Sequence, residues 1–280
     1  MTTKVIKRDS RPTALITGGS KGIGLELANQ FGQHGHDLVL VARSDRDLKR
    51  AATQLHTEYG CRVDIFSVDL TAIDALAELY RQVTDNGIQV DVLVNNAGTG
   101  DVGPFAVSDI NRQLDMLQLN IVSLTALTRL FLPGMIERGS GRILNIASVV
   151  AYFAGGSNWA SYVASKHYVL ALTRGLAKEL VGTGVNVTAL CPGPTATAFV
   201  NQAGAGVMRI YRWLPKVTPS EVARAGYRAA MAGQTTAVPG LLNKLFAFLG
   251  ELPPRSIAQW VFGFLSRSPL VTTTDARKAS

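Results

Sequence analysis

Short apolar segments alternate with stretches of helical periodicity along most of this 280-residue chain. The apolar segments are rich in leucine or β-branched residues and are bounded by turn residues. They are Thr13–Thr17, Leu38–Ala42, Val63–Val68, Val90–Asn95, Arg142–Ala147 and Val185–Leu190. Their apolar residues run on rather than alternate, which is typical of parallel strands covered on both faces. The alternation therefore predicts one α/β domain with a doubly wound parallel sheet and right-handed crossovers.

Three of the intervening stretches begin with a helix start signal. Each has a serine or threonine followed three residues later by an acidic residue, as in a capping box. The three signals are Ser44 with Asp47, Thr71 with Asp74, and Thr218-Pro219 with Glu221.

The last 40 residues have a different pattern. Apolar residues recur at helical spacing on either side of Pro253-Pro254, which predicts two amphipathic helices hinged at the prolines. The first group is Leu241, Leu242, Leu245, Phe246 and Leu249, and the second is Ile257, Trp260, Val261, Phe264 and Leu265. We expect a disordered N-terminus at residues 1–10, one domain over residues 11–240, and a helical extension with a polar tail at residues 241–280.

Positive charge is concentrated in the C-terminal part of the chain. The formal net charge is +8, and residues 201–280 hold ten lysines and arginines against three acidic residues, a net charge of +7. This asymmetry favours an acidic partner or an anionic membrane surface, unless it is a solvated basic face that aids solubility. We expect no nucleic-acid partner.

The composition favours a cytoplasmic protein, with membrane association as the alternative. Residues 1–11 do not have the pattern of a secretory signal, and no window of about 18 apolar residues predicts a spanning helix. The two cysteines, Cys61 and Cys191, make no disulfide framework, which fits a reducing compartment. The four histidines lack partners at metal-binding spacing, so we expect no metal.

The first apolar segment runs directly into TGGSKGIG, residues 17–24. Gly18, Gly22 and Gly24 would let the backbone turn sharply and approach a pyrophosphate, and the helix that follows would present free N–H groups and its positive end. A glycine-rich turn without a ligand is the alternative. The position between the first strand and the first helix indicates a dinucleotide site.

The end of the second strand indicates which nicotinamide cofactor is bound. A carboxylate at this position would bind the ribose 2′-hydroxyl of NAD, but here the strand ends in Arg43 and Ser44. Arg43 can form a charge-assisted fork with a 2′-phosphate, and Lys21 in the glycine loop adds a second cation. The pattern favours NADP(H), although Arg43 alone could be a solvated cation and Ser44 only a helix cap.

The motif YVASK, residues 162–166, places Tyr162 and Lys166 on one face of a helix. A nearby ammonium stabilises a phenolate, so Lys166 is expected to lower the pKa of Tyr162 and make it a usable acid or base. Such a pair could also be ordinary surface packing. Ser148, at the carboxyl end of the preceding strand, favours the catalytic interpretation, because reactive groups gather at that edge of a parallel sheet.

Taken in order, TGGSKGIG, NNAG at 95–98, Ser148, YVASK and Pro192-Gly193 resemble the short-chain dehydrogenase/reductase family. The resemblance covers roughly residues 11–240. It implies a seven-stranded doubly wound sheet and an NADP(H)-dependent oxidoreductase that interconverts a carbonyl and an alcohol. It also implies a homo-oligomer, a dimer or a tetramer, built on the helices around residues 111–138 and 158–181.

The same resemblance implies the role of each matching residue. Tyr162 is expected to donate the proton to the carbonyl oxygen and Ser148 to hydrogen-bond that oxygen. Lys166 is expected to bind the nicotinamide ribose, and Asn120 in LQLN to hold a water of the proton relay. The expected cofactor-binding residues are Gly18, Ser20, Lys21, Gly22, Ile23, Gly24, Arg43, Ser44, Asp69, Leu70, Asn96, Ala97, Gly98, Tyr162, Lys166, Pro192, Gly193, Thr195 and Thr197.

More closely, segments such as NNAGTGDVGPF and LCPGPTATAF resemble bacterial ketoreductases with a hydrophobic C-terminal extension. The expected substrate is lipophilic, such as a 3-oxoacyl chain, a steroid or an aliphatic ketone. The C-terminal helices could pack on the domain or on a second subunit, roof the active site, or lie in a membrane interface through residues 241–270. Alternatives for the function are an alcohol dehydrogenase working oxidatively and an NADP(H)-binding regulator or scaffold without turnover.

Overall fold

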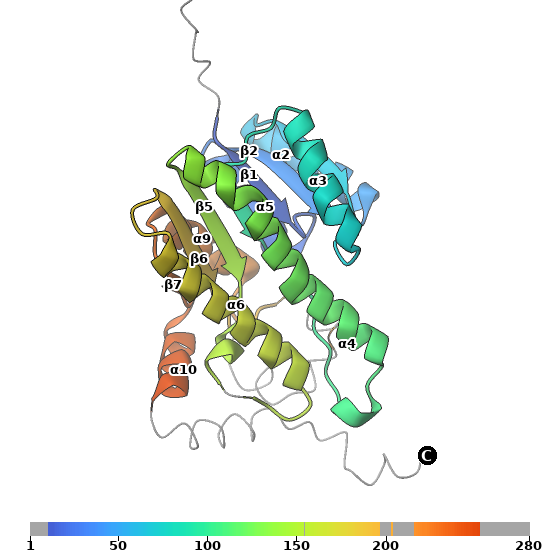
Figure 1. The fold of residues 1–280 in the computed structure, drawn as a ribbon, viewed down its shortest axis with the longest axis vertical. Helices are drawn as coiled ribbons and strands as arrows, with labels where there is room; N and C mark the ends of the chain where they lie inside the picture. The colour runs from blue at the N-terminus through green and yellow to red at the C-terminus, as the bar shows by residue number, and fades with distance from the viewer. Residues whose placement is uncertain (1–10, 154, 197–202, 204–215, 253–280) are drawn as a thin grey trace, which may run out of the picture.

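Seven parallel strands form one sheet in the order β3-β2-β1-β4-β5-β6-β7 (Figure 1). Their bounds are β1 Thr13–Thr17, β2 Asp37–Ala42, β3 Val63–Ser67, β4 Val92–Asn95, β5 Gly141–Ile146, β6 Val185–Leu190 and β7 Thr236–Ala237. The strand order reverses between β1 and β4, and a crevice opens beyond the carboxyl ends of the strands at such a switch point. The predicted doubly wound fold with seven strands is confirmed.

The structure, a computed structural model, describes residues 11–153, 155–196, 203 and 216–252. Several sequence-based expectations lie outside these residues. They concern the N-terminus at residues 1–10, Thr197, the second amphipathic group at 257–265, and the polar tail.

Helices cover both faces of the sheet because successive side chains of a strand point to opposite faces. On one face Ile16 and Leu40 pack with α1 (Gly22–Gln33), α2 (Asp45–Tyr59) and α9 (Pro219–Met231). On the other face Leu15 and Val39 pack with α3 (Ile73–Asp85) and α5 (Leu124–Glu137). The helix α6 (Ala160–Glu179) lies beside α5 in front of the strands in Figure 1 and contacts β6. The sheet is therefore buried on both faces, as its continuous apolar strands predict.

Two of the three expected helix starts are confirmed, and one is wrong. The Ser44 hydroxyl accepts a hydrogen bond from the backbone N–H of Asp47, and Thr218 and Glu221 form a reciprocal capping box. Thr71 does not cap α3, which begins at Ile73. Instead its backbone N–H and its hydroxyl both donate to the Asp69 carboxylate, at 3.0 and 2.8 Å. Asp69 thus holds the backbone N–H that a capping box would give to Asp74, and Ala72 is the N-cap instead.

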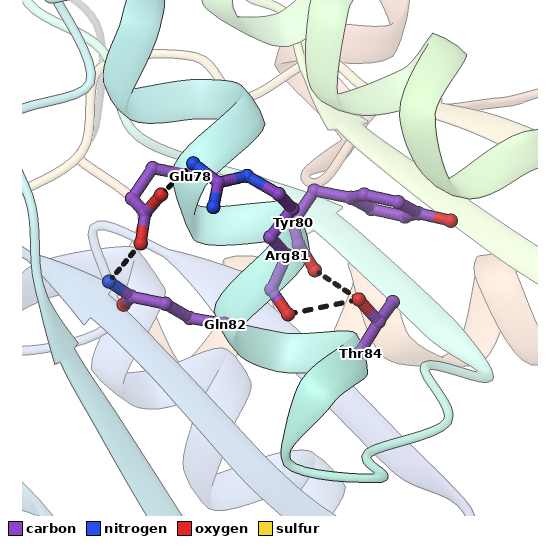
Figure 2. A network of polar contacts seen from close by, with 5 residues as sticks. All are labelled: Glu78, Tyr80, Arg81, Gln82 and Thr84. Carbon is purple, nitrogen blue, oxygen red and sulfur yellow. Dashed lines mark hydrogen bonds and ion pairs between the residues drawn. The ribbon is translucent and has the colours of Figure 1, made fainter.

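The exposed side of α3 carries a polar network of its own residues (Figure 2). Arg81 and Gln82 both donate to the Glu78 carboxylate. The Thr84 hydroxyl donates to the backbone carbonyls of Tyr80 and Arg81, at 3.0 and 2.9 Å. Such pairs one helical turn apart stabilise a solvated helix face modestly.

A continuous helical segment runs from Ile110 to Glu137 and consists of α4 (Ile110–Leu117), the π-helical turn η2 (Gln118–Ser123) and α5. By length and composition alone it could cross a membrane, with a mean hydropathy of 1.5 over an 18-residue window. The expectation that no segment has this character is therefore too strict. Core helices of soluble proteins pass the same test, and here α5 packs on α3, β4 and β5.

The predicted first helix of the C-terminal extension is α10 (Leu241–Glu251), but it is turned the opposite way from an ordinary amphipathic helix. It packs on the segment around Tyr152 through Ala247 and Gly250 and on Gly193 through Asn243, and all three residues of the helix are buried. Phe246 is partly buried against Phe153, with ring centroids 4.2 Å apart. The leucines that define the periodicity are exposed.

Candidate active site

The glycine loop joins β1 to α1 with a backbone that only glycine accommodates. Gly18 and Gly22 have positive φ angles of 65° and 59°. A Cβ on Gly24 would lie 2.2 Å from the Gly18 carbonyl oxygen, so the loop and the first turn of the helix are in close contact. The N-cap of α1 is Lys21, which makes no side-chain capping bond. The N–H groups at Gly22, Ile23 and Gly24 therefore begin a helix without a side-chain cap, which suits a pyrophosphate.

The carboxyl end of β4 is tied to this loop by Thr17 and Asn96. The Thr17 hydroxyl accepts hydrogen bonds from the backbone N–H groups of Asn96 and Ala97, at 3.0 and 2.9 Å. The Asn96 amide donates to the carbonyls of Thr17 and Gly18, at 2.9 and 3.3 Å. Asn96 thus lies behind the glycine loop and supports it.

A cleft of about 570 Å³ opens along this edge of the sheet. Nine of the expected cofactor-binding residues line it: Gly18, Ser20, Lys21, Arg43, Ser44, Asp69, Leu70, Ala97 and Gly98. Its far wall holds an ion pair that the sequence did not suggest, between Arg112 and Asp101 at 3.2 Å. The cleft matches the glycine-rich half of a dinucleotide site, because its floor is backbone and its rim carries cations.

The charges around the cleft favour an anion beside the end of β2. Lys21 and Arg43 are exposed at the rim. The nearby carboxylates are already engaged: Asp47 pairs with Arg50 at 3.1 Å. The pKa of Asp69 is lowered by hydrogen bonds from the backbone and hydroxyl of Thr71, with a smaller contribution from Arg43.

Tyr162 and Ser148 meet beyond the carboxyl end of β5. Ser148 begins the short 3₁₀ helix η3 (Val149–Tyr152), and Tyr162 lies in the first turn of α6, buried and stacked on Trp159 with centroids 4.7 Å apart. Burial raises the pKa of the Tyr162 phenol, and a side-chain hydrogen bond with Ser148 lowers it. A phenol that stays protonated in contact with a serine hydroxyl can donate a proton to an oxygen that is gaining negative charge.

Lys166 lies one turn further along α6, and its effect on Tyr162 differs from the expectation. Its ammonium donates to the Ile146 carbonyl at 2.8 Å, and burial lowers the pKa of Lys166 to about 8. The expected lowering of the Tyr162 pKa by this ammonium is wrong for this structure. Burial dominates the phenol, and Ser148, not Lys166, is the group that opposes it.

Asn120 lies in the π-helical turn η2 and is buried. Its side-chain oxygen accepts from the Thr99 N–H at 3.0 Å, and its amide donates to the Thr99 carbonyl at 2.9 Å and to the Ser165 hydroxyl at 3.1 Å. A Cβ on Gly98 would lie 3.0 Å from the Asn120 oxygen and 3.6 Å from Lys166 Nζ. Asn120 and Lys166 therefore converge on the backbone of Gly98.

The turn after β6 completes this edge. The Pro192 carbonyl accepts from the Val149 N–H at 2.9 Å and from the Ser148 hydroxyl at 3.4 Å. The Thr195 hydroxyl donates to the Gly193 carbonyl at 2.9 Å. The structure thus brings the turn beside Ser148, and of its expected residues only Thr197 falls outside the described part of the chain.

The family is decided by comparison with known proteins. A family model described as short chain dehydrogenase matches residues 12–207. The chain belongs to the short-chain dehydrogenase family. It is therefore an oxidoreductase of carbonyl and alcohol groups, and the resemblance stated from the motifs is confirmed.

Proteins similar to this short-chain dehydrogenase include ketoreductases, and some of the similar structures were solved in complex with NADPH. It is 34% identical over 256 residues to the ketoacyl reductase HetN of Nostoc sp., covering 88% of this chain and 86% of that protein. Among solved structures, a short-chain dehydrogenase from Sphingobium yanoikuyae in complex with NADPH superposes with a TM-score of 0.77, at 32% identity over 85% of this chain and 92% of the other. A variant of actinorhodin polyketide ketoreductase with NADPH gives a TM-score of 0.73, at 33% identity over 82% and 95%.

Sequence reasoning about this short-chain dehydrogenase missed several residues that hold the site together. Thr17 and Ser165 lie inside the motifs TGGSKGIG and YVASK, but the motifs alone predict no role for either residue. Thr99 directly follows NNAG and binds both polar atoms of Asn120. Asn145 is fully buried, accepts from the Asn95 amide at 2.9 Å and donates to Thr173 at 3.0 Å. The position of Asn145 inside an apolar strand was the available signal, because a buried amide needs partners.

Proposed function

We propose that this short-chain dehydrogenase reduces a ketone with NADPH, and oxidises the matching secondary alcohol in reverse. The observation that carries the proposal is the convergence of Tyr162, Ser148, Lys166 and Asn120 at the edge of the sheet that also holds the glycine loop. A buried phenol next to a hydroxyl and an ammonium is suited to proton transfer, and it has little use as a structural feature.

The residues divide the chemistry between them. NADPH supplies a hydride to the carbonyl carbon when it is bound. Tyr162 and Ser148 donate hydrogen bonds to the carbonyl oxygen, which gains negative charge during the reaction, and Tyr162 delivers the proton. Lys166 holds the ribose of the cofactor, and its positive charge then lies close to the phenol. Asn120 holds a water that returns a proton toward Lys166.

The preference for NADPH rests on Arg43 and Lys21. Both are exposed cations on the rim of the cleft, and Arg43 stands at the end of β2, where an NAD-dependent enzyme carries a carboxylate. An arginine fork can hold a 2′-phosphate through two parallel hydrogen bonds. Two of the similar structures contain NADPH, which supports the same choice.

We infer a lipophilic substrate such as a 3-oxoacyl chain or a steroid. Tyr162 belongs to an apolar cluster that includes Met116, Val150, Phe153, Trp159 and partly buried Val102. The name of the ketoacyl reductase relative points to the same class of substrate. Substrate contacts through an apolar wall would select chain length rather than polar groups.

We also infer a homo-oligomer built on the helices around residues 111–138 and 158–181, which are α4, η2, α5 and α6. Large apolar residues on these elements are exposed, including Ile110, Leu114 and Val122, and Tyr168 is bonded to Thr125 at 2.9 Å. Large exposed apolar patches mark association surfaces. Light scattering during gel filtration is expected to give a dimer or tetramer mass, and a monomer would contradict the inference.

The function is tested by following NADPH oxidation with ketones of graded chain length, alongside NADH as the competing cofactor. We expect turnover that prefers NADPH and rises with chain length. Binding of NADPH without oxidation by any ketone in the panel would instead favour a regulator. Faster turnover with NADH would overturn the cofactor assignment while leaving the reaction intact.

A further inference from the structure

The helix α10 presents its bulky apolar side chains to the outside. At 100° per residue, five large apolar residues of α10 fall within an arc of about 120°, and Leu252 at its C-cap is a sixth exposed one. The most exposed are Leu241 at 83% and Phe248 at 60%. Together the six form what we call the leucine face: Leu241, Leu242, Leu245, Phe248, Leu249 and Leu252. Monomeric proteins rarely leave such a stripe in water.

The opposite side of α10 fixes this orientation. A Cβ on Gly250 would lie 2.6 Å from the Tyr152 carbonyl oxygen, so the helix touches the underlying backbone. The buried Asn243 amide donates to the Pro239 carbonyl at 2.8 Å, and Asn243 packs directly on Gly193. The helix cannot roll its leucines inward without breaking these contacts. The leucine face is therefore a fixed outer surface of the part of the chain that the structure describes.

The charge next to the leucine face is positive. The one carboxylate of α10, Glu251, is paired with Arg174 at 2.8 Å. Lys244 is exposed beside the leucines, and Lys216 is exposed next to Val217, which lies against Gly240 at the start of the helix. Residues 201–280 as a whole carry a net charge of +7.

We propose that the leucine face of α10 docks on an anionic lipid surface. Leucine and phenylalanine side chains would enter the boundary between headgroups and acyl chains, while Lys244 and Lys216 meet the anionic headgroups. A second copy of the chain is disfavoured as the occupant, because pairing two leucine faces would bring two positive regions together. This inference does not depend on the proposed reaction.

The experiment is flotation of the full-length protein with vesicles of phosphatidylcholine, alone or containing about one-third phosphatidylglycerol. We expect binding to the anionic vesicles, weaker binding at high salt because the charges are screened, and little binding to the neutral vesicles. The double variant Leu245→Glu with Phe248→Glu is expected to bind anionic vesicles about tenfold or more weakly, because it places charge in the apolar stripe.

Val181→Glu is the matched control. Val181 is 80% exposed in the turn between α6 and β6, so the substitution adds one glutamate, where the double variant adds two, to an exposed apolar position elsewhere. It should bind vesicles like the parent protein, and both variants should keep NADPH binding, which shows that they fold.

Three results would overturn the proposal. One is failure of the full-length protein to float with anionic vesicles. Another is equal loss of binding in the double variant and in Val181→Glu, which would indicate a general charge effect. The third is a lower mass of the double variant in light scattering with vesicle binding intact, which would make the leucine face a contact between subunits.

Discussion

The ammonium of Lys166 lies 5.8 Å from the centroid of the Tyr162 ring, one turn further along α6. Both side chains are buried, and their pKa values move in opposite directions for the same reason. Burial disfavours the charged form, so it raises the pKa of the phenol and lowers that of the amine to about 8. Proton transfer from the phenol to the amine is thereby disfavoured, because burial separates two pKa values that are nearly equal in water.

Tyr162→Phe should nearly abolish turnover while leaving cofactor binding in place. Removal of a positioned general acid lowers kcat by about 10²–10⁴-fold. NADPH affinity, measured by fluorescence titration, should change little, since the ring that packs on Trp159 is kept. Tyr168→Phe is the control, because Tyr168 lies on the same helix and its hydroxyl meets Thr125. Equal activity of both variants would rule out the role given to Tyr162.

Lys166→Met should make the cofactor-free protein more stable and weaken the binding of NADPH. The pKa of the folded lysine is about 8, below its ordinary 10.5, so the charged form costs stability at pH values below about 8. The cost shrinks as the pH rises toward 10.5, where the unfolded chain also loses its proton. The variant also loses the hydrogen bond to Ile146. With this loss included, we expect its free energy of unfolding to rise by about 1–2 kcal/mol at pH 7.

The measurement is urea unfolding of both proteins at pH 7 and pH 10. The advantage of the Lys166→Met variant should decrease at the higher pH, and its affinity for NADPH should fall at both. A variant that is less stable at pH 7 would show that the ammonium is not penalised by burial.

Arg43→Ala should reduce discrimination between the two cofactors. Loss of charge-assisted hydrogen bonds to a phosphate is expected to raise the KM for NADPH about tenfold or more, with little change for NADH. Arg81→Ala is the control, because Arg81 is an exposed arginine held by Glu78 on α3 (Figure 2) and does not line the cleft. An equal rise in the KM values for NADPH and NADH would show that Arg43 does not contact the 2′-phosphate.

Gly193→Ala should disturb the turn after β6 through a specific clash. A Cβ there would lie 2.2 Å from the Asn243 side-chain oxygen, and overpacking of this kind costs about 1–3 kcal/mol. Asn243→Ala should partly rescue it, so that the double variant is more stable than Gly193→Ala alone. Thermal unfolding of the four proteins measures the coupling. Simple additivity would mean that the two residues do not press on each other.

The sequence predicted the sheet well because six strands carry dense apolar signals of their own. Their ends are placed within one or two residues, as at Val90, where β4 begins at Val92. The seventh strand, Thr236–Ala237, has only two residues. Nothing local identifies it, and it forms because β6 leaves an edge that pairs with it. It was expected only through the family resemblance.

The sequence predicts which residues form the site but not how deeply each of them is buried. Motif spacing brings Tyr162, Ser148 and Lys166 to one edge, yet the sign of the pKa shift at Tyr162 depends on burial, which spacing does not report. Periodicity predicted α10 equally well, but not which side packs. That choice depended on Gly250 and Gly193, whose missing side chains admit close contact.

The π-helical turn at Gln118–Ser123 has one further consequence. Such a turn holds one residue more than an α-helical turn, so deletion of a single residue within it would leave an unbroken, regular helix. The wider turn absorbs the extra residue, so the helices on the two sides of the deletion would keep nearly the same relative orientation while residues within the turn change phase. Asn120 would then lose its contacts with Thr99 and Ser165 while α5 kept its place. Deletion of one codon could therefore leave the protein folded but inactive.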